Sequence, residues 1–221
     1  MDDFLKTKRI FVFLGRSGSG KTENALSFAE NCAHQAGKIV RFFDIDQTKQ
    51  MFRAREAQWD SSKIKFELTP EFGDCPLIAE GLSGALQGTD ICVIDVGGDT
   101  VGSVMAGQFS EILNKEFVQI FYVINPYRSF CNTKEQIVQQ MQRTLDAAGL
   151  KHADILCNPN FGVGTTAEDI LQGYQKLDKL LLPDYQISAI SVVDRFWEDI
   201  EIEKISKLPL RIHTRYGCGI A

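Results

Sequence analysis

Short apolar runs alternate with longer amphipathic segments from one end of the chain to the other. The runs are apolar throughout instead of alternating with polar residues, which is typical of strands buried on both faces of a parallel sheet. They predict strands at residues 9–14, 38–43, 63–68, 90–96, 117–124, 153–157 and 186–192, with a weaker candidate at 208–212.

Amphipathic helices are predicted in the intervals between these strands. Apolar residues recur at three- and four-residue spacing in two segments, residues 137–150 and 168–181. The recurring positions are Ile137, Met141, Leu145 and Ala148 in the first segment and Ile170, Tyr174, Leu177 and Leu181 in the second. Thr165, Thr166 and Glu168 are typical of the start of the second helix.

No linker, repeat or low-complexity tract divides the chain, so residues 1–221 are expected to form a single domain. We expect an α/β fold, a three-layer, doubly wound, mostly parallel sheet with helices on both faces. In such a fold ligands bind beyond the carboxyl ends of the strands. The functional residues are therefore expected in the loops that follow the strands.

The composition is that of an ordinary globular protein, with 44% hydrophobic and 24% charged residues. The net charge of −5 argues against a general nucleic-acid binder, which needs a basic face. No stretch approaches the roughly 18 apolar residues of a membrane-spanning helix, and the first apolar run is too short for a signal-peptide core. We therefore expect a cytoplasmic protein without a membrane partner. The six cysteines contain no C-x-x-C pair, so neither a disulfide framework nor a zinc site is expected.

A glycine-rich segment after the first predicted strand fits the Walker A pattern G-x-x-x-x-G-K-[ST] at every fixed position. It consists of Gly15, Arg16, Ser17, Gly18, Ser19, Gly20, Lys21 and Thr22. The glycines let successive N–H groups point into one concavity that suits phosphate oxygens. Lys21 is expected to reach the β- and γ-phosphates, and the Thr22 hydroxyl to ligate Mg²⁺. The alternative is a glycine-rich turn that matches by chance, but the strand before the segment and the helical pattern after it favour a P-loop.

A second carboxylate is needed to hold the metal opposite the P-loop. Asp95 ends the apolar run at residues 91–94, where a buried strand would emerge at the ligand edge, and is our Walker B residue. Gly98 completes a D-x-x-G arrangement in which a glycine N–H could sense the γ-phosphate, as switch segments do. The alternative is that Asp95 caps the helix that follows.

Asp44 and Asp46 form a D-x-D sequence after the second predicted strand and should also reach the ligand edge. Asp46 is the candidate that orients an attacking water or hydroxyl. The alternative is that both carboxylates cap a helix that begins near Gln47.

The order of these motifs resembles the MinD/ParA and cobyrinic-acid-synthase group of P-loop NTPases, the SIMIBI type. Residues 42–56 and 93–100 look most like segments of the group's less characterised bacterial ATP-binding proteins, and the likeness runs at motif level from Phe11 to Asp169. In relatives the residue after the first P-loop glycine is often a lysine that crosses a dimer interface to the partner's nucleotide. Arg16 occupies this position here, so the resemblance implies a homodimer in which Arg16 has that task. The alternative is an exposed loop arginine.

The resemblance also implies an asparagine that hydrogen-bonds adenine at the end of a late strand. Asn158 occupies such a place, with Asn125 as a second candidate, although asparagine before proline is also ordinary turn chemistry. The guanine signature N-K-x-D is absent, since the nearest string, at residues 114–117, ends in Phe117. ATP is therefore expected instead of GTP.

The leading interpretation is a magnesium-dependent ATP-binding protein, an ATP hydrolase that acts as a nucleotide-driven switch or assembly factor on a client protein. One alternative is a small-molecule kinase that resembles shikimate kinases, in which Arg53 or Arg55 would bind a substrate carboxylate. Another is a nucleotide sensor that does not hydrolyse ATP. In the C-terminal third, Phe196, Trp197 and Ile200 are expected either in the core or in a partner-binding patch.

Overall fold

The computed structural model describes residues 2–36, 39–45, 63–68 and 81–213. In these residues eight strands form one sheet in the order β3-β2-β4-β1-β5-β6-β7-β8, and every neighbouring pair is parallel. The strands are β1 (Ile10–Leu14), β2 (Val40–Asp44), β3 (Ile64–Leu68), β4 (Ile91–Asp95), β5 (Val118–Ile124), β6 (Asp154–Cys157), β7 (Ile187–Val193) and β8 (Ser206–Leu210). Every strand predicted from the sequence is confirmed. β2 begins two residues later than expected and β8 two residues earlier, and the other starts differ by one residue.

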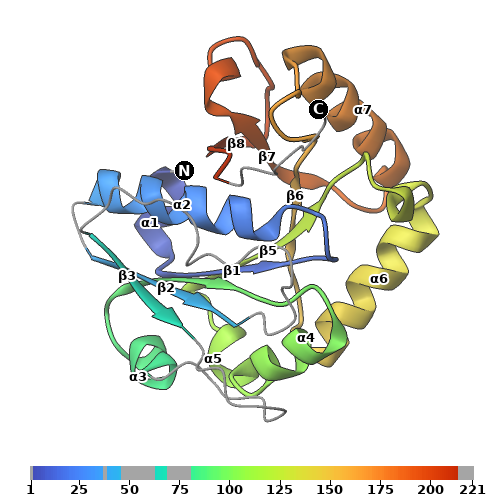
Figure 1. Cartoon of the computed structure of the whole chain (residues 1–221). Helices are drawn as coiled ribbons and strands as arrows, with labels where there is room; N and C mark the ends of the chain where they lie inside the picture. Colours follow the sequence, from blue (N-terminus) through green and yellow to red (C-terminus); the bar gives the residue numbers. More distant parts are fainter. Residues whose placement is uncertain (1, 37–38, 46–62, 69–80, 214–221) are drawn as a thin grey trace, which may run out of the picture.

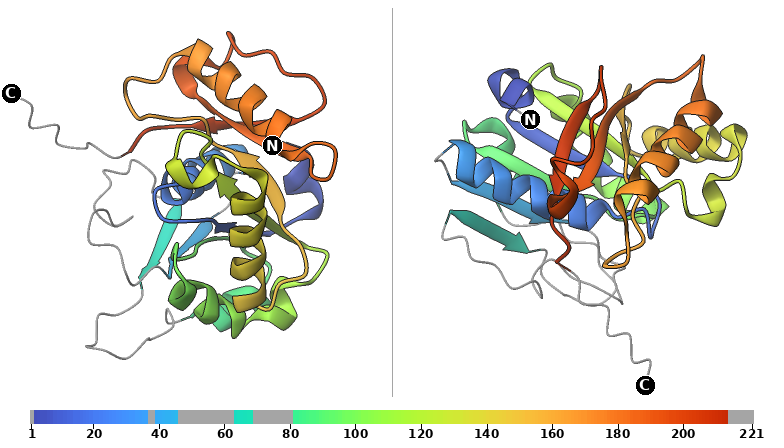
Figure 2. Two further views of the ribbon diagram at one scale, coloured as in Figure 1. Left: turned by 90° about the vertical axis from the view of Figure 1, so that its right-hand side faces the viewer. Right: turned by 90° about the horizontal axis from the view of Figure 1, so that it is seen from above.

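Helices cover both faces of the sheet, as Figures 1 and 2 show. The α-helices are α1 (Asp2–Thr7), α2 (Lys21–Ala36), α3 (Leu82–Gln87), α4 (Thr100–Gly107), α5 (Ser110–Leu113), α6 (Lys134–Ala147) and α7 (Ala167–Leu181). Two short 3-10 turns, η2 (Ser129–Cys131) and η3 (Asp194–Phe196), follow β5 and β7. Residues of α1 and α2 pack on one face, and residues of α3 to α7 pack on the other. The predicted three-layer arrangement is therefore confirmed.

The two long helices predicted from apolar periodicity begin at threonine caps. The Thr133 hydroxyl caps α6, where it accepts from Gln136 N at 3.3 Å. Thr166 and Asp169 form a capping box at the start of α7. Such caps satisfy backbone N–H groups that have no partner within the helix, so they fix where each helix begins.

A cluster of aromatic rings attaches α2 to the sheet. Phe28 lies with its ring centroid 4.5 Å from that of Phe11, 5.6 Å from that of Phe13 and 6.1 Å from that of Phe121. All four side chains are buried. Because each ring removes a large apolar area from water, this cluster fixes the helix that starts at the end of the P-loop.

The four cysteines in the described part of the chain are buried free thiols. Burial raises the pKa of the Cys92 and Cys131 thiols to about 11 and that of the Cys32 and Cys157 thiols further. These cysteines therefore act as small apolar core residues.

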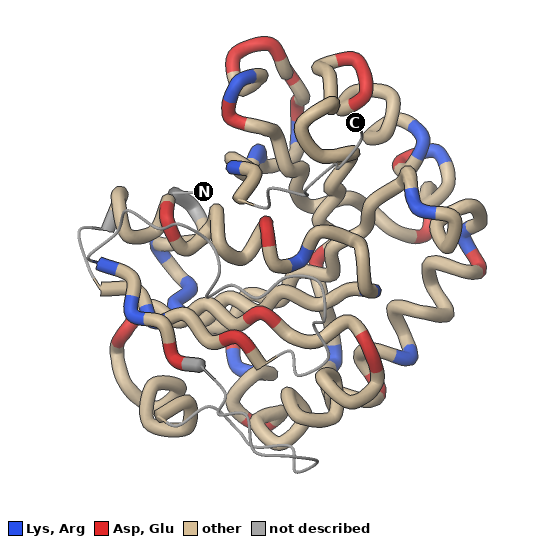
Figure 3. The backbone as a smooth tube through the Cα atoms, in the orientation of Figure 1, with Lys and Arg blue, Asp and Glu red and all other residues tan. Residues whose placement is uncertain are grey.

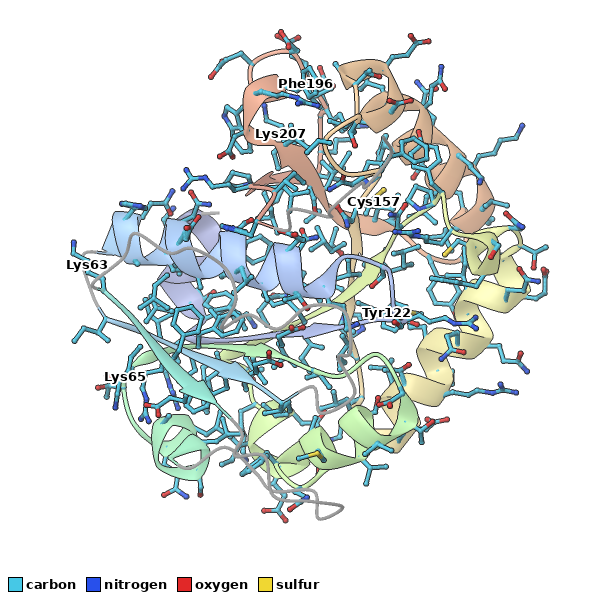
Figure 4. The ribbon with its side chains drawn as sticks, in the orientation of Figure 1. Lys63, Lys65, Tyr122, Cys157, Phe196 and Lys207 are labelled. Atoms are coloured by element: carbon cyan, nitrogen blue, oxygen red, sulfur yellow. The ribbon has the colours of Figure 1, made fainter. Side chains whose placement is uncertain are left out.

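The segment after β7 packs against the core. Ile200 is fully buried, while Phe196 and Trp197 are partly buried against the same cluster. Lys207 Nζ lies 4.4 Å from the centroid of the Trp197 ring, and Figure 4 shows Lys207 and Phe196 on this part of the molecule. Ile200 is therefore a core residue, while Phe196 and Trp197 pack against the edge of the core.

Charged residues of both signs are interspersed along the described backbone (Figure 3). No helix within the described ranges combines the length and the apolar character needed to cross a bilayer.

The last described residues cover a polar side of α2. Arg211 N donates to Ser27 Oγ at 2.9 Å, and His213 N donates to Glu23 Oε2 at 2.8 Å. Arg211 Nη1 lies 3.2 Å from Glu30 Oε2. Ser27, Glu23 and Glu30 are all buried. Residues 211–213, which we call the α2 strap, therefore give buried polar groups of α2 hydrogen-bond and ion-pair partners.

Burial in this contact changes the acidity of two side chains. The His213 side chain is 5% exposed, and its burial, with Arg211 nearby, lowers the pKa of the imidazole to about 4. Burial raises the pKa of the Glu30 carboxyl. The folded protein therefore holds His213 neutral at pH values where the unfolded chain would protonate it.

We expect stability to fall as the pH drops through the titration of His213. Its folded pKa of about 4 lies below its ordinary value of 6.5, so this contribution is complete above pH 6.5 and is lost as the pH falls toward 4. Urea unfolding should show that the free energy of unfolding of the wild type falls by about 1–3 kcal/mol between pH 7 and pH 4. The variant His213→Asn should lack this decrease. The raised pKa of Glu30 acts in the opposite direction. Because His213 Nε2 lies 3.7 Å from Glu30 Oε2, the comparison reports the net effect of the pair, in which the histidine causes the fall. His152→Asn, which replaces a side chain that is 79% exposed, is the matched control, and equal pH slopes for all three chains would contradict this account.

Candidate functional site

The predicted P-loop connects β1 to α2 at the carboxyl edge of the sheet, and Lys21 is the first residue of α2. Gly15, Gly18 and Gly20 have φ angles of 139°, 78° and 90°. The requirement for glycine is clearest at Gly15, where a Cβ atom would lie 2.5 Å from the Val123 backbone oxygen. The loop therefore has the curled backbone that a phosphate-binding concavity needs.

The two predicted metal ligands are in contact. Thr22 Oγ1 donates to Asp95 Oδ2 at 2.6 Å, and Asp95, at the end of β4, is fully buried. The parallel register of β1 and β4 pairs Phe13 with Asp95, which brings the carboxylate beside the start of the P-loop. A hydroxyl and a carboxylate next to a phosphate site are donors that suit Mg²⁺, which usually keeps several waters and binds few protein ligands. The residues present therefore fit a Mg²⁺–nucleotide complex.

Asp95 does not cap the helix that follows it, so the alternative role considered for this residue is wrong. The N-cap of α4 is Asp99, whose side chain accepts from Gly102 N at 2.9 Å. Asp95 lies at the end of the strand and contacts Thr22 instead.

Gly98 lies directly against the P-loop. A Cβ atom at this position would lie 2.5 Å from Ser17 N and 2.8 Å from Lys21 Nζ. Lys21 itself is 5% exposed, and its Nζ lies 3.5 Å from the Arg16 carbonyl oxygen. The D-x-x-G segment and the Walker A lysine are therefore neighbours, as the sequence predicts, and the role of Gly98 as a γ-phosphate sensor stays a prediction.

Asn158 lies next to the P-loop, after β6. Its Nδ2 donates to the Ser19 carbonyl oxygen at 2.8 Å, and the side chain is buried. Within the described residues Asn158 Oδ1 and Ser19 Oγ are buried and have no hydrogen-bond partner. By contrast, the Asn125 amide is used within its own loop, since Nδ2 donates to Asn160 O and Oδ1 accepts from Tyr127 N. Of the two candidate asparagines, Asn158 is therefore the one whose side-chain oxygen has no hydrogen-bond donor among the described residues and lies beside the P-loop.

Arg16 is exposed, and its guanidinium lies over the Phe130 ring at 4.6 Å from the centroid.

Asp44, at the end of β2, is buried and is the register partner of Asp95. The first carboxylate of the D-x-D sequence thus reaches the predicted edge. The other residues named from that region, Asp46, Arg53 and Arg55, lie outside the described residues.

One contact with the P-loop is missing from the sequence-based prediction. Arg128 Nε donates to the Gly18 carbonyl oxygen at 2.9 Å. The only sequence signal is indirect, since Asn125 and Pro126 indicate that the chain leaves the sheet at the ligand edge just before this arginine.

Comparison with known proteins bears on the fold. No protein-family model and no curated protein matches the sequence. The ParA family ATPase from Chlorobium tepidum TLS superposes with a TM-score of 0.50 at 16% identity, over 83% of this chain and 83% of that chain.

Two structures of FlhF, complexed with GTP/Mg²⁺ and with GMPPNP/Mg²⁺, superpose with TM-scores of 0.48 and 0.47 at 12% and 13% identity. They cover 81% and 82% of this chain, which spans only 64% of FlhF. The resemblance that the sequence predicts is confirmed at the level of the fold, which is the three-layer P-loop NTPase fold that the ParA family ATPase also has.

Proposed function

We propose that this protein binds Mg-ATP at the P-loop and hydrolyses it as a nucleotide-driven switch or assembly factor for a client protein in the cytoplasm. The observation that carries the proposal is the 2.6 Å contact between Thr22 Oγ1 and Asp95 Oδ2 beside a loop with P-loop backbone geometry. The name of the structural neighbour, a ParA family ATPase, supports the same activity. The absence of an N-K-x-D sequence supports ATP as the nucleotide.

Each residue of the site has a task in this proposal. The P-loop N–H groups and Lys21 bind the phosphate oxygens, and Thr22 and Asp95 hold Mg²⁺. The metal would neutralise charge on the phosphates and orient them. Gly98, which lies against Ser17 and Lys21, reports the presence of the γ-phosphate. In the same proposal Asp46 orients the attacking water, and Asn158 is the residue that would hydrogen-bond the base.

We further propose that the active form is a homodimer in which Arg16 serves the partner's nucleotide. Arg16 is exposed at the P-loop, and no described carboxylate forms an ion pair with it. Its stacking on Phe130 is a modest interaction, of about 0.5–1 kcal/mol at an exposed site. Exchange of this ring for an anionic phosphate across an interface would therefore be favourable.

The dimer proposal predicts that the rate of Mg-ATP hydrolysis per chain rises with protein concentration. Arg16→Ala should lower the maximal rate about tenfold or more while ATP binding persists, because a transition-state arginine is removed. Lys21→Ala is the control that should lose binding itself. Phosphate release and calorimetric ATP binding, measured on all three chains, check both effects.

A rate independent of concentration in a protein that stays monomeric would contradict the dimer. Binding with a near-zero rate in both wild type and Arg16→Ala would contradict hydrolysis by the protein alone.

Gly98→Ala is expected to weaken Mg-ATP binding about tenfold or more, because the added Cβ atom displaces Lys21 Nζ or the Ser17 amide. Gly84→Ala is the matched control, since a Cβ atom there meets nothing within 4 Å. That change in α3 should leave binding unchanged and raise stability by up to about 1 kcal/mol. Calorimetry gives the affinities and urea unfolding the stabilities, and equal affinities for the two variants would refute the contact between Gly98 and the phosphate site.

A further inference from the structure

A rigid loop after β5 presents Arg128 to the P-loop. Arg128 N donates to Asn125 O at 3.1 Å, and Cys131 N donates to Arg128 O at 2.9 Å, so the backbone is fixed on both sides. The Asn125 side chain also ties this loop to Asn160 on the next loop. The backbone that carries Arg128 is therefore held in place before any ligand arrives.

A second interaction reinforces the loop. The Tyr127 ring stacks on Phe161 with 4.0 Å between centroids, and the Tyr127 hydroxyl donates to the Asp169 carbonyl oxygen at the start of α7. Residues of three connections, after β5, after β6 and at α7, thus support the position of Arg128. The loop backbone therefore loses little additional entropy when Arg128 binds a ligand.

The side chain of Arg128 acts on one peptide of the P-loop. Its Nε bonds the Gly18 carbonyl oxygen, and its guanidinium carbon would lie 3.9 Å from a Cβ atom on Gly18. In a trans peptide the C=O of Gly18 and the N–H of Ser19 point in opposite directions. The Ser19 N–H donates to the Arg16 carbonyl oxygen at 3.1 Å, so both polar groups of the Gly18–Ser19 peptide are bonded and its orientation is fixed.

The charge of Arg128 is also without a described counter-charge. None of the described carboxylates forms an ion pair with it. Of the five N–H donors of a guanidinium, one is used by Gly18, and the others of this exposed side chain bond no acceptor among the described residues. Such a cation at the rim of a phosphate loop favours an anion there.

We propose that Arg128 is a positioning residue for the polyphosphate chain of the nucleotide, supplied by the same chain that carries the P-loop. It fixes the orientation of the Gly18–Ser19 peptide through the Gly18 carbonyl oxygen and adds positive charge at the rim of the loop. This inference rests on the proposed function, because it assumes that a nucleoside triphosphate is the ligand.

The test compares four variants of the full chain. Arg128→Ala and Arg128→Met remove the charge, Arg128→Lys keeps it, and Arg143→Ala on the exposed side of α6 is the matched control. Mg-ATP affinity should fall about tenfold in the first two variants, recover substantially in Arg128→Lys, and stay unchanged in the control. The urea unfolding midpoint without nucleotide should be the same in all five proteins.

Hydrogen exchange without nucleotide supplies an independent readout. The Ser19 amide should exchange faster in Arg128→Ala and Arg128→Met than in wild type, because the peptide is released. Wild-type affinity and exchange in both charge-removing variants would overturn the inference and leave the proposed function intact. Equal loss of affinity in Arg128→Lys and Arg128→Ala, with a lowered unfolding midpoint, would show a structural role and also overturn it. A wild-type protein that binds no Mg-ATP would instead refute the proposed function, and the inference with it.

Discussion

The placement of α2 is the constraint on which the candidate site depends, because its first turn carries Lys21 and Thr22. Phe28 fixes one side of the helix among rings from β1 and β5. The α2 strap fixes another side through bonds to Glu23 and Ser27. Since Thr22 Oγ1 and Asp95 Oδ2 are 2.6 Å apart, a shift of the helix by about 1 Å would already break their hydrogen bond. Core packing and polar contacts far from the ligand edge therefore act directly on the site.

The strand order explains why these residues meet. β1 lies between β4 and β5, and the chain builds β2 to β4 on one side of β1 and β5 to β8 on the other. The loops after β1, β4 and β5 thus diverge at one point of the carboxyl edge, which is where doubly wound sheets bind ligands. The P-loop, Asp95 and Arg128 come from these three loops, although Arg128 is 110 residues from Gly18 in sequence.

Local sequence patterns predict most strands and the long helices of this arrangement, but they do not predict several of its contacts and short helices. Apolar runs reveal buried strands because both faces of a covered parallel sheet exclude water. The edge strand β8 is displaced from its predicted range because Ser206 and Lys207 are tolerated where a strand has one neighbour only. The contact between Arg128 and Gly18 has no local signal, since it exists only once the strand order is known. The α2 strap has no local signal either, since its bonds to α2 join residues up to 190 positions apart. The short helices α3 to α5 are not predicted because they span too few turns to show a period.

The electrostatics of the site differ from those of the whole chain, which has a net charge of −5. Arg16 and Arg128 lie at the P-loop without described carboxylate partners, and Ser19 Oγ and Asn158 Oδ1 are buried there without hydrogen bonds in the described structure. Each buried polar atom left unbonded costs about 1–3 kcal/mol, which is a sizeable part of the roughly 5–15 kcal/mol by which a domain is stable. A polyanion can accept from the Ser19 hydroxyl and from the two guanidinium groups, which would relieve part of that cost, whereas Asn158 Oδ1 is an acceptor and needs a donor. The free protein therefore already favours the class of ligand for which the P-loop is built.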